Sequence, residues 1–125
     1  MAPALENIDR DALLEKIERG DELVIIDALS PISFAALRLP GAVNITPGTV
    51  DEQAPRRIPD HATEVVVYCQ SPACDASVEV AERLIELGYL NVRHYAGGKD
   101  EWAAAGLPLE GGRASAPTTG ETTTP

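Results

Sequence analysis

Apolar residues gather in this chain in short continuous runs, and the stretches around these runs show helical periodicity. Four runs predict strands at residues 23–27, 42–45, 65–68 and 91–95. Apolar positions at helical spacing predict helices at residues 9–20, 31–37, 76–88 and 99–105. Because strands that alternate with helices form parallel sheets, the pattern predicts an α/β fold.

Two parts of the chain depart from this alternation. Residues 46–62 are rich in proline and charge, so we expect a loop there, with a single helical turn near residues 50–53 and the pair Arg56-Arg57 in solvent. After Leu109 the composition changes to Gly, Ser, Thr, Pro and Ala, with almost nothing to bury. We therefore expect an N-terminal arm at residues 1–7, one domain at 8–110 and a disordered C-terminal tail at 111–125.

Composition limits the classes of partner and the cell compartment that we expect for this protein. A chain of 125 residues can bury a core as one domain, and it has no run of 18 apolar residues that would predict a membrane helix. The net charge of −10 argues against nucleic acid or an anionic membrane as partner. The N-terminus lacks a basic region followed by an apolar core, so we expect no secretory signal. Two cysteines five positions apart are no disulfide framework, so we expect a reducing, cytoplasmic location.

The candidate chemistry lies in the loop that follows the predicted strand at 65–68. This loop begins with Cys69, and a helix starts shortly after it. The carboxyl end of a parallel strand is where α/β folds place their active sites. Loop N–H groups and a helix N-terminus both favour a thiolate, the reactive form of cysteine. Cys69 is therefore the candidate nucleophile, and the other loop residues are Gln70, Ser71, Pro72, Ala73, Cys74, Asp75 and Ala76.

Three segments, taken in order, resemble a rhodanese-like domain over about residues 8–109. They are VIIDALSPISFAALRLPGAVNIT (24–46), VVVYCQSPACDAS (65–77) and NVRHYAGGKDEWAAAGLPL (91–109). The resemblance implies a five-stranded parallel sheet flanked by helices on both faces, with Cys69 as the catalytic cysteine after the fourth strand. It also implies a sulfurtransferase that moves a sulfane sulfur from thiosulfate or a related donor to a thiol or cyanide through a persulfide on Cys69. No metal or organic cofactor is implied.

The candidate loop departs from the usual pattern of that family. Pro72 stands where a glycine is usual and removes one N–H donor, and the loop is about two residues longer than the common form. Cys74 and Asp75 stand where an arginine is frequent, which disfavours a phosphatase, because that activity needs an arginine to hold the oxyanion. Asp27 and Arg38 are possible supporting residues of the site.

Three alternatives stay open. Cys74 is either a resolving thiol for Cys69 or a small apolar filler, since a disulfide requires Cα atoms within about 7 Å. The pair could accordingly serve as a thiol redox switch, and a rhodanese-like fold could also serve as a noncatalytic binding module. His61 and His94 are poorly placed as general bases, and their spacing to the cysteines disfavours a zinc site.

Overall fold

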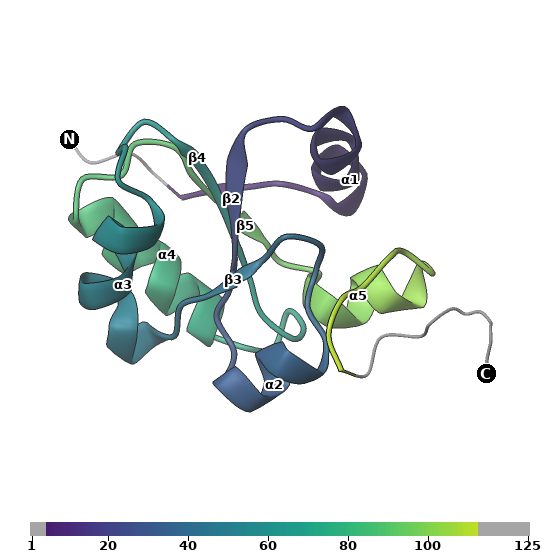
Figure 1. Cartoon of the computed structure of the whole chain (residues 1–125). Helices are drawn as coiled ribbons and strands as arrows, with labels where there is room; N and C mark the ends of the chain where they lie inside the picture. The colour runs from purple at the N-terminus through teal and green to yellow at the C-terminus, as the bar shows by residue number, and fades with distance from the viewer. Residues whose placement is uncertain (1–4, 113–125) are drawn as a thin grey trace.

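A single parallel sheet of five strands forms the centre of the protein (Figure 1). The computed structural model describes residues 5–112, so residues 1–4 of the expected arm and 113–125 of the expected tail lie outside the described residues. The strand order is β1-β5-β4-β2-β3. The strands are β1 (Glu6–Asn7), β2 (Leu23–Asp27), β3 (Val43–Asn44), β4 (Glu64–Tyr68) and β5 (Val92–Tyr95). This architecture confirms the predicted α/β fold.

Helices cover both faces of the sheet, as the resemblance implied (Figure 1). Helices α1 (Arg10–Arg19) and α5 (Gly98–Ala104) pack on one face, where Leu13 and Trp102 are fully buried. The opposite face carries a short 3-10 helix, η1 (Pro47–Thr49), together with α3 (Val50–Arg57) and α4 (Ala76–Glu86). Helix α2 (Pro31–Ala36) follows the carboxyl end of β2, and none of its residues is buried.

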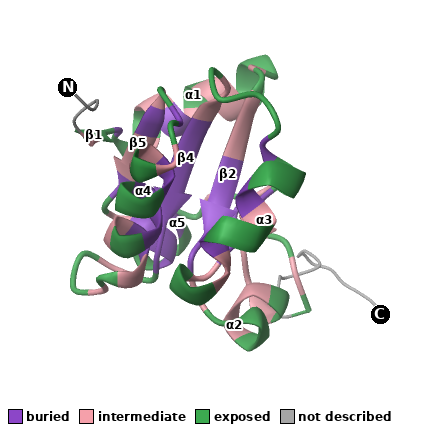
Figure 2. Ribbon diagram, turned by 90° about the vertical axis from the view of Figure 1, so that its left-hand side faces the viewer, coloured by how far each residue is buried: buried purple, intermediate pink, exposed green. Residues whose placement is uncertain are grey.

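The register of the central strands determines which residues meet at the carboxyl edge of the sheet. β2 and β4 pair from Leu23 with Glu64 to Asp27 with Tyr68. Both strands are most buried toward their carboxyl ends (Figure 2). Asp27 and Tyr68 therefore lie side by side in a dry environment, and Cys69 follows directly.

Local sequence signals explain most of the boundaries of these elements. The Asp9 side chain accepts a hydrogen bond from the Ala12 N–H and caps α1, and Gly20 ends that helix in the left-handed conformation. Pro31 occupies the first turn of α2, where its missing N–H costs nothing. None of the helices within residues 5–112 is long and apolar enough to span a bilayer.

Two elements differ from the sequence analysis. The chain after η1 forms the eight-residue helix α3 instead of a single turn, and Arg56 and Arg57 end this helix instead of lying in a loop. Pro55 suggested a loop, but burial of Val50 and Ala54 against the sheet outweighs the hydrogen bond that proline removes. Residues 6 and 7, which we placed in an arm, form β1 and pair with β5.

Candidate active site

Cys69 lies at the carboxyl end of β4, in the loop that connects this strand to α4. Its side chain is only 2% exposed. The backbone of α5 supports the loop from below, because the Lys99 N–H donates to the Cys69 carbonyl at 3.0 Å and the Asp100 N–H donates to the Gln70 carbonyl at 2.9 Å. A Cβ at Gly98 would lie 2.6 Å from the Cys69 carbonyl oxygen, so this close approach requires glycine.

The loop is curled by a tight turn at Ser71-Pro72-Ala73-Cys74. The Cys74 N–H donates to the Ser71 carbonyl at 3.1 Å, and the Ser71 Oγ accepts from the Ala73 N–H at 3.3 Å. Proline at the second position and serine at the first are the residues that such a turn prefers. The turn directs Cys74 back toward Cys69.

Cys69 and Cys74 form a disulfide in this structure, with their Cα atoms 6.2 Å apart. This separation falls within the usual range for disulfides. The Cys74 sulfur therefore lies against the Cys69 sulfur, and the role of Cys74 as a resolving thiol stays a prediction.

Three backbone N–H groups of this loop have no acceptor among the described residues. The N–H groups of Gln70, Ser71 and Asp75 donate to no acceptor within residues 5–112, whereas those of Ala73 and Cys74 are used in the turn. Successive backbone N–H groups of this kind bind anions. Pro72 lacks an N–H group, but its fixed φ angle favours the turn that curls the loop.

A buried carboxylate, Asp27, lies beneath the loop and is fully inaccessible to solvent. Its Oδ2 accepts from the Tyr68 hydroxyl at 2.7 Å and lies 3.3 Å from the Lys99 Nζ, and its Oδ1 accepts from the Leu29 N–H at 2.9 Å. Burial and the adjacent Asp27 charge raise the pKa of Tyr68 well above its ordinary value, so this tyrosine stays a neutral donor. Asp27 thus joins β2 to β4 and α5.

The residue that pairs with Asp27, Lys99, was not predicted from sequence. Its side chain is 4% exposed, and its Nζ also donates to the Ser33 carbonyl of α2 at 3.2 Å. A small cavity of about 150 Å³ lies beside it, lined by Ser33, Ala36, Leu37, Gln70 and Lys99. Lys99 therefore connects α2 to the loop that carries Cys69.

Arg38 and His94 form no hydrogen bond or ion pair with Asp27, Tyr68 or Lys99 in the described part of the chain. Arg38 stacks over the Phe34 ring at 4.8 Å and lies 3.9 Å from Glu110, so its contacts are with α2 and the end of the domain. The His94 Nε2 lies 2.8 Å from the Ser77 Oγ, which joins β5 to the first turn of α4. Burial lowers the pKa of His94.

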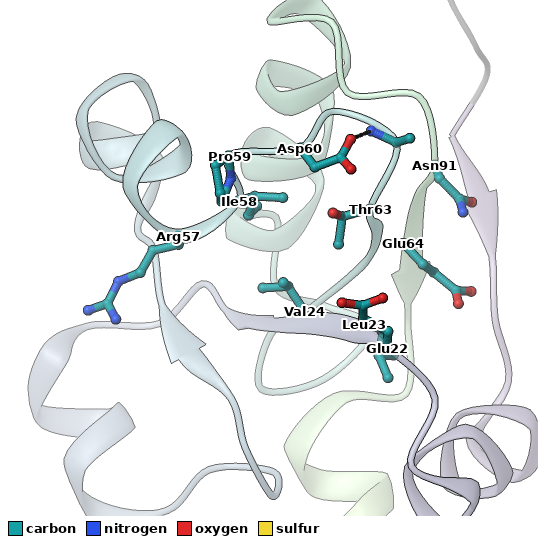
Figure 3. Close-up of a pocket in the computed structure, with 11 residues that line it drawn as sticks. Glu22, Leu23, Val24, Arg57, Ile58, Pro59, Asp60, Thr63, Glu64 and Asn91 are labelled. Atoms are coloured by element: carbon teal, nitrogen blue, oxygen red, sulfur yellow. Dashed lines mark hydrogen bonds between the residues drawn. The ribbon is translucent and has the colours of Figure 1, made fainter.

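A pocket of about 560 Å³ lies at the opposite end of the sheet, beside the amino ends of β2 and β4 (Figure 3). Two of its acidic side chains already have partners: Asp60 accepts from the Ala62 N–H at 2.9 Å, and Glu64 pairs with Lys16 at 3.2 Å and Arg93 at 3.4 Å. No group of three or more residues suited to a metal ion occurs in residues 5–112. The loop of Cys69 is therefore the candidate active site.

Comparison with known proteins identifies the family. Residues 9–105 match the sequence model of the family described as the rhodanese-like domain. The chain belongs to this family. Within this rhodanese-like domain, Cys69 follows the fourth strand of the chain, as the resemblance implied.

Solved structures share its fold at low sequence identity. The BH2092 protein from Bacillus halodurans has a TM-score of 0.81 at 22% identity, over 88% of this chain and 80% of that one. A thiosulfate sulfurtransferase from Pseudomonas aeruginosa has a TM-score of 0.76 at 22% identity, over 88% of this chain and 21% of that one. The human single-domain sulfurtransferase TSTD1 has a TM-score of 0.70 at 24% identity, over 81% of this chain and 97% of that one. No curated protein matches the sequence.

Proposed function

We propose that this rhodanese-like domain is a sulfurtransferase that carries a sulfane sulfur on Cys69. The observation that carries the proposal is the position of Cys69, buried at the carboxyl end of β4 inside a curled loop with backbone N–H groups free to bind an anion. Family membership supports the same chemistry, and two of the solved structures with this fold bear the name sulfurtransferase.

The reaction would proceed in two half-steps. The Cys69 thiolate attacks the outer sulfur of thiosulfate or a related donor, the S–S bond of the donor breaks, and sulfite leaves with the bonding electron pair. The persulfide on Cys69 is anionic, and the loop N–H groups stabilise its charge. A nucleophilic acceptor, cyanide or a thiol, then removes the outer sulfur and regenerates the thiolate. Neither step requires a metal or an organic cofactor.

A thiol redox switch is the second candidate function. It is favoured by one observation, the disulfide between Cys69 and Cys74. In that function the thiols would be oxidised together by a cellular oxidant and reduced by a cellular thiol, and sulfur transfer would be incidental. The two candidates differ in whether Cys69 accepts a sulfur atom.

The proposal is tested by supplying thiosulfate, and separately inorganic polysulfide, to the fully reduced protein, with a blank that contains no protein. We expect thiosulfate to release sulfite, because sulfite leaves as the persulfide forms, whichever acceptor then takes the sulfur. We expect polysulfide to change the intact mass, by one added sulfur or by the loss of two hydrogens. The matched control is Cys69→Ser, which keeps Cys74 and the size of the side chain. Equal sulfite release by Cys69→Ser, or no response of the wild type to either donor, would refute the assignment.

A further inference from the structure

We propose that Cys74 attacks the Cys69 persulfide, so that the protein releases the transferred sulfur as sulfide and closes the Cys69–Cys74 disulfide. The inference rests on the proposed function, because it begins from the persulfide. It adds an activity, reductive release of sulfide, and it adds a second substrate, a cellular dithiol that reopens the disulfide.

The geometry determines which sulfur Cys74 can attack. The structure bonds the Cys74 Sγ to the Cys69 Sγ, which is the inner sulfur of a persulfide on that residue. Attack at this atom forms the disulfide and expels the outer sulfur, whereas attack at the outer sulfur would only move the persulfide to Cys74. The Ser71-Pro72-Ala73-Cys74 turn restricts the loop to the curled conformation, so the attack is effectively intramolecular.

Solvent access favours Cys74 over an external acceptor. Cys69 is 2% exposed, while Cys74 is half-buried and its neighbours Pro72 and Ala73 are exposed. An external thiol must enter the loop to reach the persulfide, whereas Cys74 is already inside it. Once the disulfide has formed, the external thiol meets the more accessible sulfur of Cys74 first, and its attack there releases Cys69 as a thiolate.

The steps balance in atoms and electrons. The Cys74 thiol and the anionic Cys69 persulfide give the disulfide and hydrosulfide: the bond between the two Sγ atoms forms, the bond to the outer sulfur breaks, and the proton of the Cys74 thiol goes to the outer sulfur. The outer sulfur gains two electrons, and the two cysteines lose them. A dithiol then reduces the disulfide by exchange, is itself oxidised to a disulfide, and returns both cysteines to the thiol state.

The experiment is a single turnover with the full chain, reduced and freed of reductant. We expect wild type given thiosulfate to release about one sulfide per protein, and wild type given either thiosulfate or inorganic polysulfide to lose two hydrogens in its intact mass. Sulfide is counted with thiosulfate alone, because a polysulfide solution contains and releases sulfide by itself. Cys74→Ser should keep the added sulfur as a persulfide, release sulfite from thiosulfate, and release at least tenfold less sulfide, because no intramolecular thiol remains. Cys74→Ala, which lacks the hydroxyl, should behave like Cys74→Ser.

The outcomes separate this inference from the function on which it rests. Wild type that retains the persulfide, or Cys74→Ser that releases sulfide at the wild-type rate, would overturn the role of Cys74 and leave the sulfurtransferase intact. Failure of both proteins to take up sulfur from either donor would overturn the sulfurtransferase, and the role of Cys74 with it. The wild-type measurement decides the question even where a Cys74 variant is poorly folded.

Discussion

At the scale of single residues, the ion pair of the buried lysine is the contact of the site whose loss should cost most stability. Lys99 is almost wholly removed from water, and its one charged partner within residues 5–112 is Asp27, itself fully buried. Removing one member of such a pair leaves the other charge buried without compensation. The pair therefore stabilises the site only while both members are present.

We expect Lys99→Met to lower the free energy of unfolding by about 3–5 kcal/mol, the usual cost of a broken buried pair. The double variant Lys99→Met with Asp27→Asn should recover a substantial part of this loss, since no charge is then stranded. Urea denaturation of the two proteins measures both values. The matched control is Lys16→Met, whose side chain is 20% exposed in its pair with Glu64. A Lys99→Met loss no larger than that of Lys16→Met would contradict the prediction.

The residues of the site were predictable to unequal degrees. The position of Cys69 followed from a local pattern, a strand and then a helix, and Asp27 followed from the end of its strand. Lys99 was missed because the local sequence, a lysine after two glycines, predicts an exposed side chain. Only its contact with α2, which is distant in sequence, buries it. Cys74 stayed ambiguous because its distance to Cys69 depends on the curl of the loop, which the turn at Ser71 determines.

At the scale of elements, periodicity predicted the helices whose apolar faces are continuous. It failed where contacts between residues distant in sequence determine whether a helix or strand forms. Strand β1 has only two residues, both exposed, and it exists because it pairs with β5. Helix α3 contains Pro55 and several charges, yet its buried Val50 and Ala54 and the bidentate contact of Asp51 with Arg83 of α4 hold it in place. Short-range signals carry no information about either partner.

The contact between β5 and α4 makes stability depend on pH. Burial penalises the imidazolium form of His94, so its folded-state pKa lies below the unfolded value of about 6.5. The stabilisation is therefore complete above about pH 6.5 and is lost as the pH falls through the folded-state pKa. We expect the melting temperature to fall between about pH 7.5 and 5.5, and His94→Gln to show a smaller fall. Equal falls in the two proteins would show that His94 is not the group responsible.

At the scale of the whole molecule, the residues that form the apolar core and the residues of the candidate site lie in different parts of the fold. The apolar sides of the helices cover both faces of the sheet, while the polar residues of the site gather at its carboxyl edge, where β2, β4, α2 and α5 meet. The cation in this network, Lys99, is paired with Asp27; the exposed charges nearby in the sequence are Asp75 in the loop and Asp100, which follows Lys99. The molecule as a whole carries a net charge of −10. An anionic donor therefore approaches an anionic protein, and no unpaired cation in the described loop attracts it.

This charge predicts an unusual salt dependence of sulfur loading. The rate at which thiosulfate, a dianion, loads Cys69 should rise severalfold between about 10 mM and 200 mM salt, because screening weakens the repulsion. Loading is followed by intact mass in Cys74→Ser, where the persulfide persists. Alkylation of the same thiol by iodoacetamide, which is uncharged, is the reference, and its rate should not change with salt.

Two variants of an exposed loop residue test the effect of charge. Ala73→Arg should raise the loading rate at low salt and reduce or reverse its dependence on salt. Ala73→Gln should do neither, since both substitutions enlarge the side chain but only arginine adds charge. A loading rate in Cys74→Ser that falls as salt is added would mean that the site attracts anions in spite of the charge of the whole molecule.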